Sequence, residues 1–291
     1  MKQKISVFKV INSSFLCIVA LSCFLPFVNA VAISFSSSNM AATGAVTFWP
    51  LDFTLAAYEY VITKSNFWVS FWISIQRVLL GGAVNMLLIV LSAYPLSKTK
   101  RAFKARNFFM WYMIVPMVFS GGLIPTYMIV KETGLMDKIW ALVLPVGLPL
   151  FNVILMMNFF RELPQELEEA AFMDGASHWR ILTNIYLPIT KASLATVLLL
   201  VFVFHWNSWF DGMLYMTNPS RTPMQTYIRS ITTLPLVSTG MSMEMVKLIQ
   251  LISNRTTKCA QIVIGSIPII SVYPFLQKYF VKGMTLGSVK A

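Results

Sequence analysis

Long apolar segments alternate with short polar ones along the whole of this 291-residue chain. A helix needs roughly 20 apolar residues to cross a bilayer, and several segments approach or exceed that length. They are residues 10–35, 67–96, 108–130, 139–160, 193–210 and 259–277. The pattern predicts an all-α, polytopic membrane protein with six transmembrane helices, formed as a single domain over residues 1–291.

The first of these segments has a second interpretation. Residues 10–35 carry no charge, and Val28-Asn29-Ala30 has the small residues of a secretory cleavage site. The apolar run continues beyond Ala30, which favours a retained transmembrane helix over a cleaved signal peptide.

The third and fourth segments contain residues that disturb helices. The third holds Pro116, Gly121, Gly122 and Pro125, and the fourth holds Pro145, Gly147 and Pro149. Such residues produce either kinks whose backbone groups neighbouring helices satisfy, or broken helices that line a pathway. Both interpretations stay open, and the second would place Gly121 and Gly122 on a pathway.

Arg77 lies near the outer end of the second segment, where its side chain could snorkel to the interface.

The longest polar segment, residues 162–191, predicts two short helices joined by a turn. Pro164 and the following glutamates suit a helix start, since the positive end of the helix dipole favours acids there. Asp174-Gly175 ends that helix, and Ser177 can cap the next one. Spacing puts four residues on one shallow face: Leu167, Ala170, Ala171 and Asp174. On a membrane protein this arrangement predicts a docking element.

The formal net charge of +12 is explained by topology. Lysine and arginine gather in short loops on one side, which the positive-inside rule assigns to the cytoplasm. The densest group is Lys98, Lys100, Arg101, Lys104 and Arg106. Both termini and residues 162–191 are therefore expected in the cytoplasm. No basic stripe interleaved with exposed aromatics occurs outside the spans, so we expect no nucleic-acid partner.

Catalytic, metal and nucleotide motifs are missing from the sequence. It has no G-x-x-x-x-G-K-[ST] loop. His178 and His205 have no partner at metal-ligand spacing, and neither do the three cysteines. The acidic residues form no intramembrane pair of the kind that relays protons. We therefore predict no catalytic residue and no metal site.

The fifth apolar segment ends in aromatic and polar residues that suit a sugar. Ring faces stack on C–H groups, and amides or carboxylates bond hydroxyls. The candidates are Trp206, Asn207, Trp209, Phe210 and Asp211. Their position at the end of a span favours the alternative of an interfacial aromatic belt with helix packing.

The polar segment carries several motifs at fixed spacing: Glu169-Ala170-Ala171, Asp174-Gly175-Ala176, Ile185 and Leu187-Pro188. Together they resemble the EAA loop of permeases from binding-protein-dependent ABC importers. Residues 121–127, 139–145, 206–210 and 273–280 resemble the carbohydrate (maltose-type) branch, in particular permeases of the LplC/YtcP type. Ala192 departs from the proline that many sugar permeases have after the lysine, which softens the start of the next span.

The resemblance implies a permease subunit in a bacterial plasma (inner) membrane. It implies a heterodimer with a second permease, two ATPase subunits that hold ATP and Mg²⁺, and an extracytoplasmic solute-binding protein. This chain would itself hold no cofactor and would not be an enzyme. The coupling helix that contacts the ATPase would include Glu169, Ala170, Ala171, Asp174 and Gly175.

Similar permeases import oligosaccharides, including uronate chains such as alginate fragments. Basic residues exceed acidic ones on the expected outer side, which favours either an acidic saccharide or an acidic surface of the binding protein. The second is favoured, because most of these charges lie in one loop, 212–258. Two other classes remain open: an ion-coupled secondary transporter working alone, and a membrane scaffold without a pore.

Overall fold

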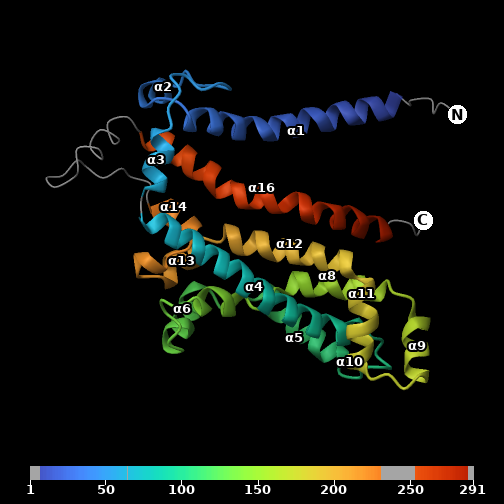
Figure 1. The fold of residues 1–291 in the computed structure, drawn as a ribbon. Helices are drawn as coiled ribbons and strands as arrows, with labels where there is room; N and C mark the ends of the chain where they lie inside the picture. The colour runs from blue at the N-terminus through green and yellow to red at the C-terminus, as the bar shows by residue number, and fades with distance from the viewer. Residues whose placement is uncertain (1–6, 64, 231–252, 288–291) are drawn as a thin grey trace. The chain divides into compact units, whose positions relative to one another are not determined.

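The computed structural model describes residues 7–63, 65–230 and 253–287, and within these ranges every regular element is a helix (Figure 1). The chain divides into two units. Unit 1 comprises residues 1–68 and 228–267, and unit 2 comprises residues 69–227 and 268–291.

Unit 1 contains α1 (Val7–Ser34), α2 (Ser38–Thr43), α3 (Ala56–Ile62) and the first part of α16 (Asn254–Gly287). Its core is small and lies around the end of α1, with Ala32, Ile33, Ala41 and Val46 buried together. Most of α1 before that point exposes apolar side chains, as a helix does when lipid rather than protein covers it.

Unit 2 begins within α4 (Ser65–Ser97), a helix of 33 residues. The third expected span is two helices, α5 (Arg106–Val118) and α6 (Leu123–Glu132), which meet at 110°. The break falls at Gly121-Gly122, where Gly122 has a φ of 88° that glycine adopts without strain. The disturbance predicted there is a true break and not a kink.

The fourth expected span is also interrupted. It consists of α7 (Trp140–Val143), the short 3₁₀ turn η1 (Leu144–Val146) and α8 (Leu150–Arg161), with a bend of 55°. Proline at position 149 removes a backbone donor, which explains why the chain restarts as a new helix there.

The polar segment and the remainder of unit 2 follow as short helices around one longer helix. The elements are α9 (Gln165–Met173), α10 (His178–Ile181), the π-helical turn η2 (Leu182–Tyr186), α11 (Leu187–Ile189), α12 (Lys191–Asn207), α13 (Phe210–Tyr215), η3 (Pro219–Arg221) and α14 (Met224–Ser230). The chain turns by 83° between α11 and α12.

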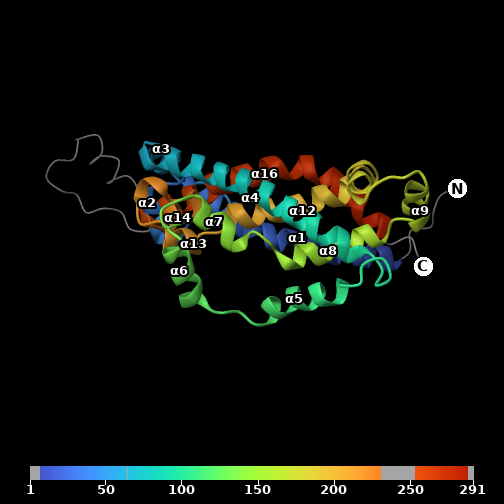
Figure 2. The same cartoon turned by 90° about the horizontal axis from the view of Figure 1, so that it is seen from below.

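The main core of unit 2 lies where α4, α8, η2 and α12 meet, and both views place these helices side by side (Figures 1 and 2). Its members include Ile89 and Tyr94 from α4, Phe160 from α8, and Tyr186 from η2. At one end of this bundle lies α9, and at the other lie α6 and α13.

Length and composition allow up to five crossings among the described residues. Phe8–Ser34 and Asn66–Ser97 each qualify alone, and three bent helix pairs qualify if each pair is one crossing. The sixth expected span, 259–277, falls inside α16 and stays a prediction.

Candidate functional site

The polar segment forms the expected helix, glycine turn and second helix. Gly175 adopts a φ of 78° after α9, its N–H donates to Phe172 O at 3.0 Å, and the N–H of Ala176 donates to Ala171 O at 2.9 Å. This pair of bonds is a Schellman cap, which satisfies carbonyls that the helix end leaves open. Ser177 caps α10 by accepting from the N–H of Arg180 at 3.4 Å.

The face that α9 turns outward differs from the expected one. Ala171 is 9% exposed and belongs to the core of unit 2, so it does not lie on the free face with Ala170 and Asp174. Met173, by contrast, is 88% exposed. The pattern of small residues could not decide this, because α9 is short and its alanines fit either side.

Glu168 and Glu169 are neighbours in sequence with different surroundings. Glu169 is exposed, whereas the Glu168 side chain is only 15% exposed and forms an ion pair with Lys98, Nζ to Oε2 at 2.8 Å. The hydroxyl of Tyr186 donates to the same carboxylate oxygen at 2.7 Å and lies 2.8 Å from Nζ. Nζ also lies 4.0 Å from the ring centroids of Tyr94 and Tyr186. We call Lys98, Glu168, Tyr94 and Tyr186 the Lys98 cluster.

Burial and charge oppose each other inside the Lys98 cluster. Burial lowers the pKa of the Lys98 ammonium, and the bond to Glu168 counteracts that effect. Burial and the Glu168 carboxylate both raise the pKa of the Tyr186 hydroxyl, so the tyrosine stays a neutral donor.

A cavity of about 490 Å³ opens beside the Lys98 cluster, between the loop after α4 and α9. Arg106 and Arg161 both line it, and both donate to the carbonyl of Leu96, at 3.0 and 3.1 Å. They cap the last turn of α4, where cations are favoured by the helix dipole. Lys98, Glu168 and Glu169 also face this cavity.

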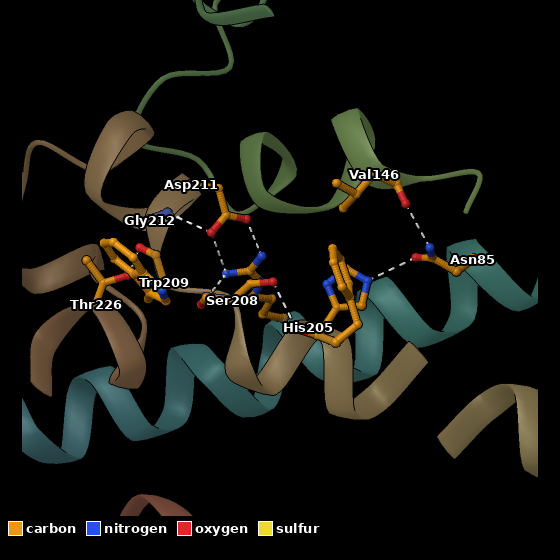
Figure 3. A network of polar contacts seen from close by, with 10 residues as sticks. Asn85, Val146, His205, Ser208, Trp209, Asp211, Gly212 and Thr226 are labelled. Carbon is orange, nitrogen blue, oxygen red and sulfur yellow. Dashed lines mark hydrogen bonds and ion pairs between the residues drawn. The ribbon is translucent and has the colours of Figure 1, made fainter. Parts of the chain in front are cut away.

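In the first half of α4, Arg77 is fully buried and does not snorkel as expected. Its Nη1 donates to Ser208 O and to Asp211 Oδ1, each at 3.1 Å, and Nη2 forms an ion pair with Oδ2. Ser208 and Asp211 lie at the break between α12 and α13 (Figure 3). Pairing removes the need for Arg77 to reach water, since Asp211 balances its charge and both Nη atoms bond within the protein, although Nε is buried without a hydrogen-bond partner among the described residues.

Next along α4, an asparagine joins two other elements. Nε2 of His205 on α12 donates to Oδ1 of Asn85 at 3.0 Å, and Nδ2 of Asn85 donates to the carbonyl of Val146 in η1 at 2.8 Å (Figure 3). Two glycines make this approach possible, because a Cβ on Gly81 would overlap the His205 ring and one on Gly82 would overlap Phe202. The sequence signal was the Gly81-Gly82 pair inside a span, a feature of close helix packing.

The residues expected to line a sugar path have different surroundings. Trp206 is buried, with its ring 6.0 Å from Phe71 at 81°, while Asn207 is exposed. Trp209 stacks edge to face on Phe210 at 5.5 Å. Asp211 is held by Arg77. Gly121 and Gly122 lie in the open break between α5 and α6, where a Cβ added to either would meet no atom within 4 Å.

A second cavity of about 490 Å³ lies among α4, the interrupted fourth span and α12. Its wall combines the amides of Asn85 and Asn152 with the rings of Phe151 and Phe204. The rings are 63% and 49% exposed, so their faces are available. This cavity could not be identified from the sequence, since its walls come from segments far apart along the chain.

A smaller recess of about 370 Å³ lies at the α13 end. Its lining includes Gln76, Lys138, Trp140 and Arg221. Arg221 is positioned by a bond from Nη1 to the carbonyl of Asp137 at 2.7 Å.

The carboxylate of Asp137, which also lines the recess, is engaged elsewhere. It accepts from the N–H groups of Thr217 at 2.7 Å and Asn218 at 3.0 Å. Bonds from Thr217 and Asn218 lower the pKa of Asp137, so it stays ionised and fixes the loop that carries Arg221.

Comparison with known proteins decides the family. The model of the "Binding-protein-dependent transport system inner membrane component" matches residues 85–286. The chain belongs to this family. It is therefore a multi-pass permease of the inner membrane, and such permeases are transport components that hold no cofactor of their own. Among the described residues, no three potential ligands come together to hold a metal.

Similar proteins cover nearly the full length of the permease. LplC of Bacillus subtilis (strain 168) is 40% identical over 98% of this chain and 95% of its own. The polygalacturonan/rhamnogalacturonan transport system permease YtcP of the same organism is 37% identical over 99% of this chain and 100% of its own. A chain in the crystal structure of a bacterial ABC transporter involved in the import of the acidic polysaccharide alginate matches with a TM-score of 0.82 and 32% identity, over 94% and 96% of the two chains.

Proposed function

We propose that the permease passes acidic oligosaccharides from an extracytoplasmic binding protein into the cytoplasm, driven by ATP hydrolysis in partner subunits. Relatives that are 23–27% identical are named for lactose, arabinooligosaccharides or maltodextrin. The more similar YtcP and the chain of the alginate transporter, at 37% and 32% identity, are named for polygalacturonan, rhamnogalacturonan or alginate. All three polymers contain uronate units, so a carboxylate is the group they share.

The recess at the α13 end supports this substrate class. Lys138 and Arg221 supply positive charge, Trp140 supplies a ring and Gln76 an amide. The ionised Asp137 carboxylate offsets one of these two positive charges, so the lining of the recess keeps a net positive charge of one. A uronate unit matches such a surface through its carboxylate, its C–H face and its hydroxyls.

The coupling role belongs to α9. Its surface toward an ATPase includes Glu169, Ala170 and Asp174, with Gly175 fixing the end of the helix and Ala171 anchoring it to the core. In this proposal the permease pairs with a second permease, and two ATPase subunits that bind ATP and Mg²⁺ sit against the two coupling helices. An extracytoplasmic solute-binding protein delivers the sugar.

This arrangement sets the topology. Residues 1–291 form one transmembrane domain with six spans, the last within α16, and both termini lie in the cytoplasm with α9. The basic loop between α4 and α5 then lies inside, as the positive-inside rule requires.

The sugar path follows the cavity beside α12. The amides of Asn85 and Asn152 offer hydrogen bonds, and Phe151 and Phe204 offer ring faces. Toward the outer end the path continues past Asn207, Trp209 and Phe210. Trp206 and Asp211 shape the path by holding the helices in place, since their side chains face Phe71 and Arg77.

The observation that carries this proposal is the exposed, firmly capped α9, which a transporter working alone would not need. The test is uptake of labelled oligogalacturonate by proteoliposomes that contain both permeases, the ATPase pair and the binding protein. Uptake should require ATP and the binding protein, and a neutral maltodextrin should be taken up poorly. Uptake that persists without the ATPase subunits, driven by an ion gradient, would assign the chain to secondary transport instead.

A further inference from the structure

Two adjacent carboxylates on α9 differ in exposure and in their partners. Glu169 is exposed, where a partner can reach it, whereas Glu168 turns back toward the end of α4. A helix that serves only as a surface for another protein has no need of a buried charge, because burying a charge is costly unless it is paired. Glu168 therefore calls for an explanation separate from docking.

The Lys98 cluster makes a direct connection between α9 and α4. Lys98 follows the last residue of α4, and its side chain is 7% exposed. Glu168 and the Tyr186 hydroxyl satisfy two of its three donors. The rings of Tyr94 and Tyr186 cover the ammonium and stand 5.1 Å apart at 89°. An ion pair enclosed in this way keeps its geometry better than an exposed one, since water and salt screen it less.

Helix α4 continues this connection to the far end of the bundle. It runs without interruption from the Lys98 cluster past Asn85, which bonds α12 and η1, to Arg77, which holds the α12–α13 break. A movement of α9 that is transferred to α4 is thereby delivered to the C-terminal end of α12, where His205 and Ser208 lie.

We propose that Glu168 transmits the movement of the coupling helix to α4, acting as a positioning residue distinct from the docking residue Glu169. The inference rests on the proposed ATP-driven function and assigns that function a mechanical route. ATP-driven displacement of α9 pulls Lys98 through the ion pair, and α4 moves with it as one body.

The first test measures coupling in proteoliposomes with the complete transporter. Glu168→Gln keeps the shape of the side chain and removes its charge. We expect the number of ATP molecules hydrolysed per sugar imported to rise at least threefold, while the complex assembles normally. Glu166→Gln is the matched control, because this glutamate is exposed on the same helix, and it should keep the wild-type ratio. Exchange of the charges, Lys98→Glu with Glu168→Lys, should recover most of the coupling lost by either reversal alone.

An unchanged ratio in Glu168→Gln would overturn the proposal. So would uptake and ATP hydrolysis that fall together with complex yield, since that result assigns the pair a purely structural role. Absence of sugar uptake by the wild-type transporter would instead refute the proposed function.

A distance measurement tests the route independently of any sugar. Spin labels at Lys100→Cys and Met173→Cys, both exposed positions, report the separation of the α4 end from α9. The wild-type distance distribution should be the same without nucleotide and with ATP trapped, and Glu168→Gln should shift or broaden it upon trapping. A wild-type distance that changes with ATP would show that α9 moves without α4. The native cysteines are first replaced by serine: Cys17, Cys23 and Cys259.

Discussion

At the scale of single residues, unit 2 is organised by polar contacts buried among apolar helices. Arg77 meets Asp211 in the first half of α4, Lys98 meets Glu168 just after its last residue, and Asn85 joins His205 between them. Each contact links positions far apart in sequence, so together they fix which helices are neighbours. In an apolar environment such contacts also define register, because an unpaired polar group there is costly.

Removal of one member of the Arg77–Asp211 pair should be more damaging than removal of both. Arg77→Met leaves a largely buried carboxylate without its cation and should destabilise the permease by about 3–5 kcal/mol. Arg77→Met with Asp211→Leu should recover most of that loss. Thermal unfolding of the purified complex measures both, and a double variant no more stable than Arg77→Met would contradict this account.

Gly81 should tolerate no side chain. A Cβ there would overlap the His205 ring, so Gly81→Ala should cost about 1–3 kcal/mol through overpacking and should weaken the bond to Asn85. Gly121→Ala is the matched stability control, since nothing lies within 4 Å of the added carbon. The melting temperatures of the two variants test whether Gly81 lies against the His205 ring, and equal values would refute this close contact.

These residue pairs also show where sequence reasoning stops. Arg77 inside a span was visible, but its partner lies 134 residues away, so snorkelling was the natural expectation. The aromatic and polar run from Trp206 to Asp211 suggested a sugar site, yet Trp206 faces Phe71 and Asp211 faces Arg77. Side-chain direction at a helix break depends on tertiary contacts, which periodicity does not encode.

At the scale of elements, local chemistry predicted more. Pro164, Gly175 and Ser177 gave α9, its cap and the start of α10, because each residue type suits its position whatever the surroundings. The glycines between α5 and α6 marked a break, but its angle of 110° could not be derived from the sequence. The burial of the Ala171 side chain in the core could not be derived either. A substitution such as Ala171→Arg would therefore disturb the core before it disturbed a docking surface.

The cap of α9 can be tested by adding strain. Gly175→Val places a β-branched residue at a φ of 78°, at a cost of roughly 1–2 kcal/mol, and should misplace α9. Binding-protein-stimulated ATPase activity and sugar uptake should both fall. Gly134→Val introduces similar strain at a φ of 66°, at the other end of the bundle, and should leave stimulation near normal. Normal stimulation in both variants would remove α9 from the coupling mechanism.

A separate prediction concerns whether α1 is retained or cleaved as a signal peptide. The apolar helix Val7–Ser34 continues beyond Ala30, and its last turns pack against α2. We expect the mature protein to retain it. Intact-mass spectrometry of the purified subunit checks this, and a chain that begins at Val31 would identify a signal peptide.

At the scale of the whole molecule, composition and span pattern predicted a polytopic helical membrane protein. The motifs of the polar segment indicated a permease, and the family match confirms it. Hydropathy works here because lipid requires every spanning segment to satisfy its own backbone. The two larger cavities could not be predicted, since their walls combine α4 with segments that follow it by about 50 to 120 residues.

The central claim is that α9 receives an ATPase subunit, and site-specific photo-crosslinking tests it most directly. A photoreactive phenylalanine analogue at Met173, which is 88% exposed, should form an adduct with the ATPase in intact membranes. The same analogue at Phe160, which is 1% exposed in the core, should form none. An adduct at Met173 that contains only lipid, or a protein from the extracytoplasmic side, would contradict both the coupling role and the cytoplasmic position of α9.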